Sequence, residues 1–483
     1  MVRLVFVVTV MLMIGYQAQA ATNWNNSKSS SDIKKAIQTQ VEEFEPRLGV
    51  PQALTLKSIK AARKRNLKYC DIGGWSMYFP LEDRGVIKGF AATEGNSLFN
   101  HRSNTDEFGS FMYRNMLRGI SENNLEKLKS DFLFAVNNEA FTSLKASTFT
   151  DAFPNYPMFG EPKMRAHSAL LTMAISFAVL ESQLSDNEKE TAKNWGRIFF
   201  ANMETYEDGA SSLTAILNGA GPDRLSIKIM AMSAWSVVTG DKALFKQSLS
   251  WYLAALEQIQ DGGFHKHFIK NHKSKEIKYH NDTYGALTVA AFFFEEAGFP
   301  ALSYKNSNGN SLVDGLNMIF NYLGGKKIGR KFPEPQKLRD VNYHSRGNNG
   351  TIAYAEYLKL MVPDGLSPEF NKVLNQMRNT GRLEKSQSRN GLYSVIHGGY
   401  TTCLLAMDMR PNANSNSVTT NQSESELSQL LDFYNNADFD QRSCLIRTIG
   451  SSDLWVMFKS NAKLPSKRLE ERRHEAYEKC SVN

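Results

Sequence analysis

Helical periodicity, with little alternation of apolar and polar residues, is the feature that most constrains the fold of this chain. Apolar residues recur at intervals of three and four, which is typical of helices that bury one face. The candidate helices are residues 32–44, 166–184, 187–206, 241–256, 284–297, 312–323, 351–360 and 424–433. Glycine-rich breaks lie beside several of them, as loops should. The pattern predicts an all-α fold of stacked helical hairpins.

Residues that commonly cap helices precede three of these segments. Ser31 or Asp32 can cap the first helix, and Asp241 can cap the helix that follows it. Ser185 and Glu188 have the spacing of a capping box, in which each side chain bonds to the other residue's backbone N–H. These signals predict where the three helices begin.

The N-terminus has the pattern of a secretory signal peptide. Arg3 precedes an apolar run from Leu4 to Ile14, and Ala18-Gln19-Ala20 fits a small-residue cleavage site. The run is too short to span a bilayer, so we expect no membrane insertion. We predict that residues 1–20 are cleaved before Ala21, and that the protein is periplasmic or secreted.

The net charge and the cysteines bear on the compartment and the binding partner that we expect for this protein. The formal net charge is +8, and the signal peptide contributes only Arg3 to it. Outside the cytoplasm, a basic protein would meet an acidic polysaccharide rather than nucleic acid. A positive net charge that only keeps the protein soluble is the alternative explanation. Export permits disulfides, and no CxxC zinc motif occurs. We expect one or two bridges among Cys70, Cys403, Cys444 and Cys480, with three complete pairings open.

The segment from residue 222 to residue 298 carries most of the chemical information. Its ordered features are Asp223-Arg224, Ala234-Trp235-Ser236-Val237, Gly263-Phe264, a basic turn with Lys270, His272, Lys273 and Lys275, then Tyr279-His280-Asn281 and Ala286-Leu287. This order resembles the alginate lyase family, specifically the poly-mannuronate lyases. The resemblance implies an (α/α) toroid, which we expect over residues 32–410. The helical pattern further along the chain predicts a helical C-terminal extension over residues 424–483. The resemblance also implies a lyase that cleaves an anionic polysaccharide.

The chain departs from the family pattern at one informative place. Where the family has Asn-Asn-His, this chain has Ser226-Ile227-Lys228. Counted back from the tyrosine, the arginines of the family fall on His272 and Lys275. The tyrosine therefore corresponds best, whereas the cationic residues correspond only in type.

Elimination chemistry needs the residue types found here. A base removes the proton on C5 of the uronate, an acid protonates the leaving oxygen on C4, and a cation or donor stabilises charge on the carboxylate. Tyrosine can serve as base, acid or both where cations lower its pKa. We therefore predict catalytic roles for Tyr279, His280 and Arg224, and substrate binding by Asn281, His272, Lys273 and Lys275.

Each of these residues also has a purely structural explanation. Tyr279 could be an amphipathic residue at a helix start, His280 a core or capping residue, and Asn281 a helix N-cap. Arg224 could form a structural ion pair with Asp223. The sequence leaves these alternatives open.

A second segment contains the same chemical set. Arg339, Tyr343, His344 and Arg346 stand close together before the helix expected at residue 351. They could bind substrate or even supply the catalytic pair, although polar loops of this kind often have no such role.

The sequence gives less support to other kinds of site and function. His265, His267 and His272 lack the spacing of a complete metal site, and no phosphate loop or nucleophile elbow occurs, so we expect no metal and no cofactor. A glycoside hydrolase would need two carboxylates across the bond, and no pattern pairs Asp223, Asp261 and Asp282. A non-catalytic polysaccharide-binding protein is the other alternative. The sequence predicts no oligomeric state.

Overall fold

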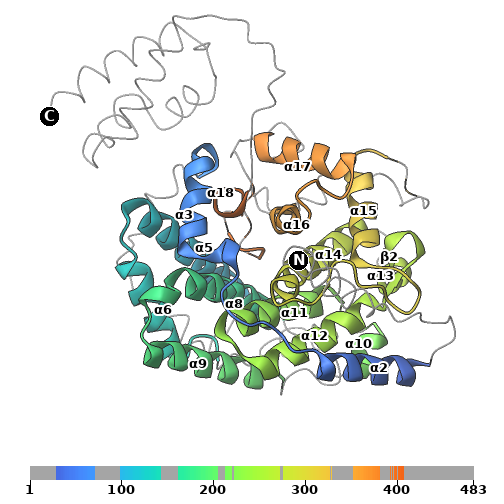
Figure 1. Ribbon diagram of the computed structural model, residues 1–483, viewed down its shortest axis with the longest axis horizontal. Helices are drawn as coiled ribbons and strands as arrows, with labels where there is room; N and C mark the ends of the chain where they lie inside the picture. The colour runs from blue at the N-terminus through green and yellow to red at the C-terminus, as the bar shows by residue number, and fades with distance from the viewer. Residues whose placement is uncertain are drawn as a thin grey trace, which may run out of the picture. The chain divides into compact units, whose positions relative to one another are not determined.

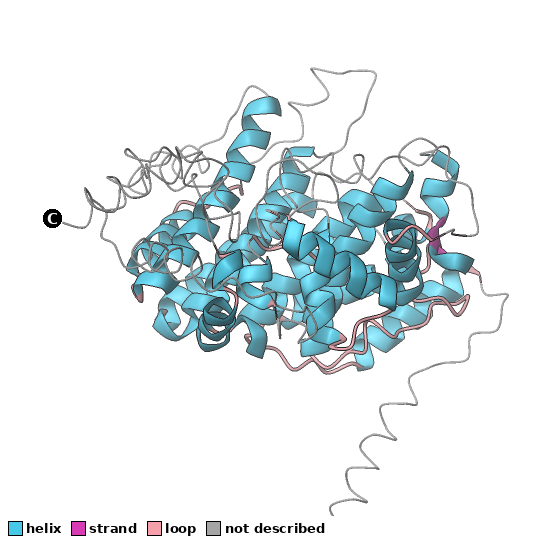
Figure 2. Cartoon of the chain, turned by 90° about the horizontal axis from the view of Figure 1, so that it is seen from above, coloured by secondary structure: helices cyan, strands magenta, loops and turns pink. Residues whose placement is uncertain are grey.

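The structure, a computed structural model, is helical almost throughout the residues that it describes (Figure 2). These are residues 29–70, 98–142, 161–204, 213–219, 222–271, 276–326, 328, 352–380, 392, 394, 396–399 and 401–406. All of them belong to one unit of the chain, formed by residues 1–72 and 79–409. A second unit, residues 73–78 and 410–483, lies outside the described residues, as does the helix expected at 424–433.

The helices and strands have the following bounds. The α-helices are α2 (Ser30–Glu43), α3 (Leu56–Arg65), α5 (Leu98–Glu122), α6 (Glu126–Asn137), α8 (Glu161–Leu180), α9 (Asp186–Glu204), α10 (Leu213–Leu217), α11 (Pro222–Thr239), α12 (Lys242–Leu256), α13 (Lys266–Asn271), α14 (Glu276–Glu296), α15 (Leu312–Leu323), α16 (Ala355–Met361), α17 (Pro368–Thr380) and α18 (Thr401–Leu405). Short 3-10 helices are η2 (Gln52–Leu54), η3 (Leu67–Tyr69), η4 (Glu181–Gln183) and η5 (Asp261–Gly263). The antiparallel strands β1 (Ile259–Gln260) and β2 (Phe264–His265) pair Ile259 with His265.

Three helices, α8, α11 and α14, are buried on every face over most of their length. Every residue is buried from 169 to 180 in α8 and from 225 to 239 in α11. A helix that is apolar all round must be enclosed by other helices. In Figure 1 these three lie in the middle, and the amphipathic helices α6, α9 and α12 lie on the rim. Each rim helix covers the inner helices with one face, which gives the (α/α) toroid expected from the sequence.

The inner helices α11 and α14 run in the same direction. The backbone N–H of Arg47 donates to the carbonyl of Ala297, which follows α14, at 2.9 Å. Two residues later, the N–H of Gly49 donates to the carbonyl of Val237, near the end of α11, also at 2.9 Å. The C-terminal ends of both helices therefore lie on one side of the ring, and their N-terminal ends on the other.

The ring is closed by contacts between segments that are far apart in sequence. Cys70 forms a disulfide with Cys403 in α18, so that one of the expected bridges joins residues 333 positions apart. Beside it, Glu356 in α16 accepts hydrogen bonds from Arg378 in α17 and from Thr402 in α18. The side chains of Glu356 and Arg378 are 0% and 3% exposed, so this is a buried ion pair. Cys444 and Cys480 lie outside the described residues.

Most helix starts agree with the expectation. Ser185 and Glu188 form the reciprocal bonds of a capping box, and Asp241 accepts from the N–H of Leu244. The first helix is capped by Ser29, with Asp32 as the second half of its box, rather than by Ser31 or Asp32. One start was wrong in a way that matters: α14 begins at Glu276, not near residue 284, and therefore includes the Tyr-His-Asn tripeptide. No helix in the described part is long and apolar enough to cross a membrane.

The buried ion pair gives a test of how the ring is closed. Glu356→Gln leaves the Arg378 guanidinium buried without its counter-charge, which should cost about 3–5 kcal/mol of unfolding free energy. Urea denaturation followed by circular dichroism measures the loss.

Lys326→Gln is the matched control, because it breaks the exposed pair between Lys326 and Glu369. That change should cost less than about 1 kcal/mol. Equal losses for the two variants would contradict the assignment of Glu356 as the anchor of α16, α17 and α18.

Candidate active site

Near their N-terminal ends, the inner helices α11 and α14 bring four polar residues to the surface. Among the residues from 276 to 294, all are buried except Tyr279 and Asp282. These two stand three positions apart, so they lie on one face of α14. In α11, Asp223 and Arg224 are half-exposed, and every following residue is buried. Because the two helices run in the same direction, all four residues lie at the same edge of the ring.

The ring of Tyr279 is fixed by its neighbours. Phe268 of α13 stacks on it, with the ring centroids 5.6 Å apart and the planes at 24°. The Lys278 ammonium lies 4.9 Å from the centroid of the tyrosine ring. The stacked ring of Phe268 and the nearby ammonium of Lys278 hold the phenol ring in place.

His280 does not share the exposure of Tyr279. Its ring is fully buried, and its Nδ1 lies 2.8 Å from the carbonyl oxygen of Glu276, to which it must donate a proton. Its Nε2 accepts a hydrogen bond from the backbone N–H of His265 at 2.7 Å. Both nitrogens are therefore bonded to backbone groups, which fixes the neutral tautomer with its proton on Nδ1. In this arrangement His280 connects strand β2 to α14, which is the structural alternative left open by the sequence.

The turn before β2 is clamped between two helices. Gly262 and Gly263 both have positive φ, and the hydroxyl of Tyr284 in α14 donates to the carbonyl of Gly263 at 2.8 Å. A Cβ on Gly263 would collide with the backbone carbonyl of Asp314 in α15. The turn is therefore held by both helices, and the residues that follow it are placed accurately.

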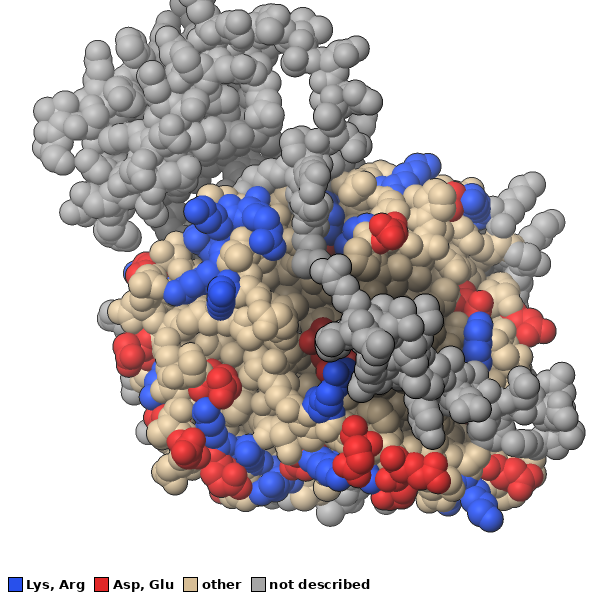
Figure 3. All heavy atoms as spheres, in the orientation of Figure 1, with Lys and Arg blue, Asp and Glu red and all other residues tan. Residues whose placement is uncertain are grey.

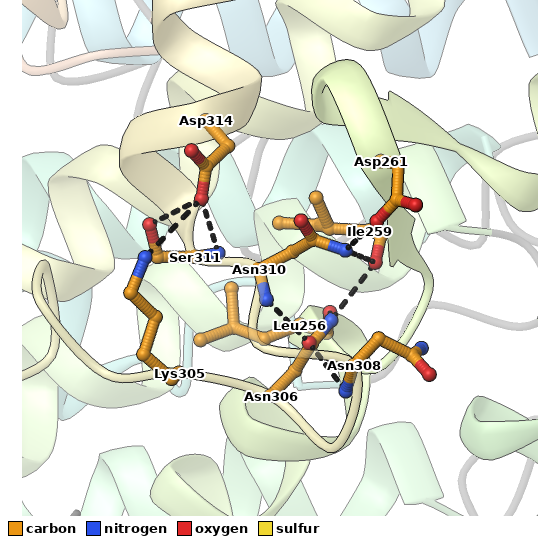
Figure 4. Close-up of polar contacts among 9 residues, drawn as sticks. All are labelled: Leu256, Ile259, Asp261, Lys305, Asn306, Asn308, Asn310, Ser311 and Asp314. Carbon is orange, nitrogen blue, oxygen red and sulfur yellow. Dashed lines mark hydrogen bonds and ion pairs between the residues drawn. The ribbon is translucent and has the colours of Figure 1, made fainter. Parts of the chain in front are cut away.

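An asparagine-rich loop holds the other side of this turn (Figure 4). The side-chain amide of Asn306 donates to the carbonyls of Leu256 and Ile259, at 2.8 and 2.9 Å. Asn310 donates to the carboxylate of Asp261 at 3.1 Å. These bonds provide donors for carbonyl groups at the end of α12 and in strand β1. The loop therefore supports the site without forming part of it.

Histidines of the β2–α13 segment connect α14 to α11. Burial lowers the pKa of His267, whereas the nearby Asp223 carboxylate and a hydrogen bond with the backbone of Gly219 raise it. His267 also lies edge-on to Phe268, the residue that stacks on Tyr279. Burial, then the neighbouring His280 and His267, hold the pKa of His265 well below its usual range. The start of α11 and the tyrosine of α14 thus belong to one contiguous region.

Lys228 is a cation inside α11 that was not among the residues predicted for the site. It is 1% exposed, and its ammonium lies 4.6 Å from the centroid of the Trp251 ring in α12. It stands four positions after Arg224, one turn along the same helix face. The signal in the sequence was a lysine within an otherwise apolar helical run, at the place where the family has histidine.

Asn281 faces a different neighbour from both Tyr279 and His280. Its carboxamide oxygen accepts a hydrogen bond from the Tyr354 hydroxyl at 2.9 Å, and it is 1% exposed. The Tyr354 ring lies against Gly285, where a Cβ would not fit, and 5.6 Å from the ring of His397. Burial, and then the charge of Asp282, raise the pKa of Tyr354 well above its usual range, so it stays protonated and donates. Asn281 lies inside the helix and is not its N-cap.

The structure therefore brings Tyr279, His280, Asn281 and Arg224 to one edge of the ring. Asp282, Lys228 and Tyr354 join them and were not predicted as site residues. The remaining predicted residues, His272, Lys273, Lys275, Arg339, Tyr343, His344 and Arg346, lie outside the described residues. Their roles stay predictions. Within the described part, no group of three or more histidine, cysteine, aspartate or glutamate side chains could hold a metal ion.

A ring of helical hairpins with tyrosine, arginine and lysine at one edge defines a toroid protein with a site suited to an anionic ligand. Comparison with known proteins identifies the family that it resembles. The model of the alginate lyase family matches residues 168–328, which include every described site residue except Tyr354. No curated protein matches the sequence.

Solved structures show the same fold. Alginate lyase A1-III from Sphingomonas species A1 is 13% identical, with a TM-score of 0.50, and the match covers 75% of this chain and 98% of that one. A variant of that enzyme with tyrosine replaced by phenylalanine, in complex with a tetrasaccharide, gives the same values. The resemblance stated from the sequence is therefore confirmed, and the (α/α) toroid with it.

The hydrogen bond between Tyr354 and Asn281 can be tested against a close control. Tyr354→Phe leaves the buried carboxamide oxygen of Asn281 without its donor, which should cost about 1–3 kcal/mol of unfolding free energy. Chemical denaturation of the two proteins measures the difference.

Tyr357→Phe is the control, three positions later in α16, the helix for which Tyr354 is the N-cap residue. The Tyr357 hydroxyl is buried and has no hydrogen-bond partner among the described residues, so its removal should be neutral or slightly stabilising. If Tyr357→Phe costs as much as Tyr354→Phe, the loss reflects packing and not the bond to Asn281.

Proposed function

We propose that the protein is a polysaccharide lyase that cleaves an anionic uronate polymer, either alginate or a related glucuronan, by β-elimination. One observation carries this proposal. Tyr279 is the phenol that α14 presents at the open edge of the ring, next to a lysine and at the same edge as Arg224. A positioned tyrosine beside cations is what proton transfer at a uronate requires.

The proposed reaction balances without any further reagent. The proton on C5 leaves to a base, and its electron pair forms the double bond between C4 and C5. The bond from C4 to the glycosidic oxygen breaks, and that oxygen takes up a proton from an acid. Negative charge develops on the uronate carboxylate during the first part, so cations and amide donors near it lower the barrier.

The residues divide these tasks according to their exposure. Tyr279 is the half-exposed group and takes the proton-transfer role. Arg224 is half-exposed on α11 and suits bidentate binding of the carboxylate. Lys228 adds a second positive charge one turn deeper on that helix. His280 is a positioning residue. Its hydrogen bonds fix the start of α14, which carries Tyr279, and the segment with Phe268, which stacks on the Tyr279 ring.

Similar proteins support this assignment. The family model that matches residues 168–328 is that of alginate lyase. One of the similar structures holds a tetrasaccharide, which is the class of ligand proposed here. Both observations favour an oligosaccharide or polysaccharide at the open edge of this ring.

Export is part of the same proposal, because an alginate-like polymer is found outside the cytoplasm. The signal-peptide pattern predicts a mature chain that begins at Ala21. Intact mass measurement of the protein recovered from a host with a secretion system tests this. A mass that still includes residues 1–20 in the exported fraction would contradict it.

Tyr279→Phe is the most direct test of the reaction. The change removes the hydroxyl and keeps the ring that stacks on Phe268, so the fold should remain intact. Turnover should fall by roughly 100-fold or more if the hydroxyl transfers a proton. The measurement is ultraviolet absorbance during digestion of polymannuronate, polyguluronate and glucuronan, because elimination creates a double bond conjugated to the carboxylate.

Controls separate this proposal from its rivals. Tyr343→Phe tests the second tyrosine-histidine segment, and it should remain active. If the Tyr343→Phe variant is inactive and the Tyr279→Phe variant is active, the catalytic centre lies in that segment. New reducing ends without rising absorbance would indicate a glycoside hydrolase, and binding without either signal a carbohydrate-binding protein.

A further inference from the structure

Helix α3 carries an unusual density of positive charge. Within its ten residues it has Lys57, Lys60, Arg63, Lys64 and Arg65, and no acidic residue. Lys57, Lys64 and Arg65 are exposed, and the other two are half-exposed. Figure 3 shows lysine and arginine gathered over this helix, on a face that is hollowed toward the middle of the ring.

None of these five cations forms an ion pair with a carboxylate in the described part of the chain. The partners that the structure gives are neutral: the Lys60 ammonium donates to the Asn123 side chain at 2.5 Å, and Arg63 donates to the Ser121 hydroxyl at 2.8 Å. These bonds hold the ammonium and guanidinium groups in place but bring no negative charge to them from the described residues. Burial alone lowers the pKa of Arg63, without a carboxylate to oppose it.

Lysines elsewhere on the described surface are commonly paired. Lys129, Lys189, Lys242 and Lys246 each lie within 3.1 Å of a glutamate oxygen. Lys34, Lys35 and Lys127 also lack such a partner among the described residues, so unpaired lysines are not confined to α3. What distinguishes α3 is that five cations stand within ten residues without an acidic residue among them.

Helix stability explains only part of the cluster. Arg63, Lys64 and Arg65 are in the last turn, where positive charge interacts favourably with the helix dipole. Lys57 is in the first turn, where the same dipole disfavours a cation. Lys60 is three positions further along and lies on the same face as Lys57. These two lysines have no structural explanation in the helix itself, so an external anion is the better account.

The charged face also has a regular spacing. Lys57, Lys60 and Lys64 follow one helix face, with axial separations of about 4.5 and 6 Å from the rise per residue. That spacing is of the order of one sugar ring, and a uronate polymer carries one carboxylate on each ring. Charge and spacing therefore both suit an extended uronate chain.

Helix α3 is joined to the segment beside the candidate site. It packs against α18, and Cys70, just after η3, is linked to Cys403 of α18. The turn that precedes α18 carries His397, which lies against Tyr354, the residue that bonds Asn281. The basic helix is thus fixed to the same frame as the site.

We propose that the exposed face of α3 is a distal binding surface for the polyanionic substrate, which holds sugars of the chain that are remote from the bond being cut. The inference rests on the proposed function. A flexible polymer held at two places gains affinity because the second contact is intramolecular. A short oligomer that fills only the catalytic edge gains nothing from α3.

The test uses the full-length protein and substrates of two lengths. Lys57→Gln/Lys60→Gln removes the two lysines that helix stability does not explain. We expect KM for long polymannuronate to rise roughly fivefold, since each exposed contact contributes modestly. Turnover at saturation, and kcat/KM for a tetrasaccharide, should stay unchanged. The salt dependence of KM for the polymer should also become flatter.

Lys34→Gln/Lys35→Gln is the matched control. It removes the same charge from α2, which lies away from α3 in Figure 1. An equal rise of KM in the control would assign the effect to net charge, and an equal loss on the tetrasaccharide would assign it to the catalytic edge. Either result, or no change at all, overturns the inference.

Two further outcomes are informative. If the unaltered protein produces no absorbance on any uronate polymer, the proposed function fails and this inference fails with it; if it is active and the α3 variant behaves like it, only the inference fails. Co-sedimentation with vesicles that contain an anionic phospholipid addresses another anion. Loss of vesicle binding in the α3 variant, with an unchanged KM for the polymer, would show a membrane-binding face and overturn the proposal.

Discussion

The enclosure of three apolar helices is the constraint on which the rest of the structure depends. Helices α8, α11 and α14 cannot expose any side without placing apolar residues in water, so rim helices must cover them. Near their N-terminal ends, α11 and α14 each bring polar residues to the surface. Arg224, Tyr279 and Asp282 are therefore gathered at one edge by the same packing that builds the core.

Three consecutive residues of α14 show how a helix distributes tasks. Successive side chains point about 100° apart around a helix with 3.6 residues per turn. Tyr279 consequently reaches the open edge, His280 turns into the core toward β2, and Asn281 points to Tyr354. Residues that are adjacent in the sequence thus face three different surroundings: the open edge, the core beside β2, and the hydroxyl of Tyr354.

The described charges of this protein differ between the interior and the surface. The buried charges of Glu356 and Arg378 compensate each other, because an isolated charge in the interior is costly. On the surface, the cations of α3 have no carboxylate partner within the described part of the chain; water screens their charge at little cost, and a polyanion could bind it. The asymmetry suits a protein whose partner is a long anionic chain.

Local periodicity and capping determined much of this protein from the sequence alone. The all-α class, the capping box at Ser185, the cap at Asp241 and the bounds of α15 follow from interactions between residues within a few positions of one another. The resemblance to alginate lyases predicted the toroid and the importance of Tyr279. Only the tertiary structure decided the start of α14, the partners of His280, the burial of Lys228 and the bond between Asn281 and Tyr354. Each of these features depends on groups that are brought together from distant parts of the chain. Burial and hydrogen bonding between such groups produce no pattern in the local sequence, so the sequence alone does not predict them.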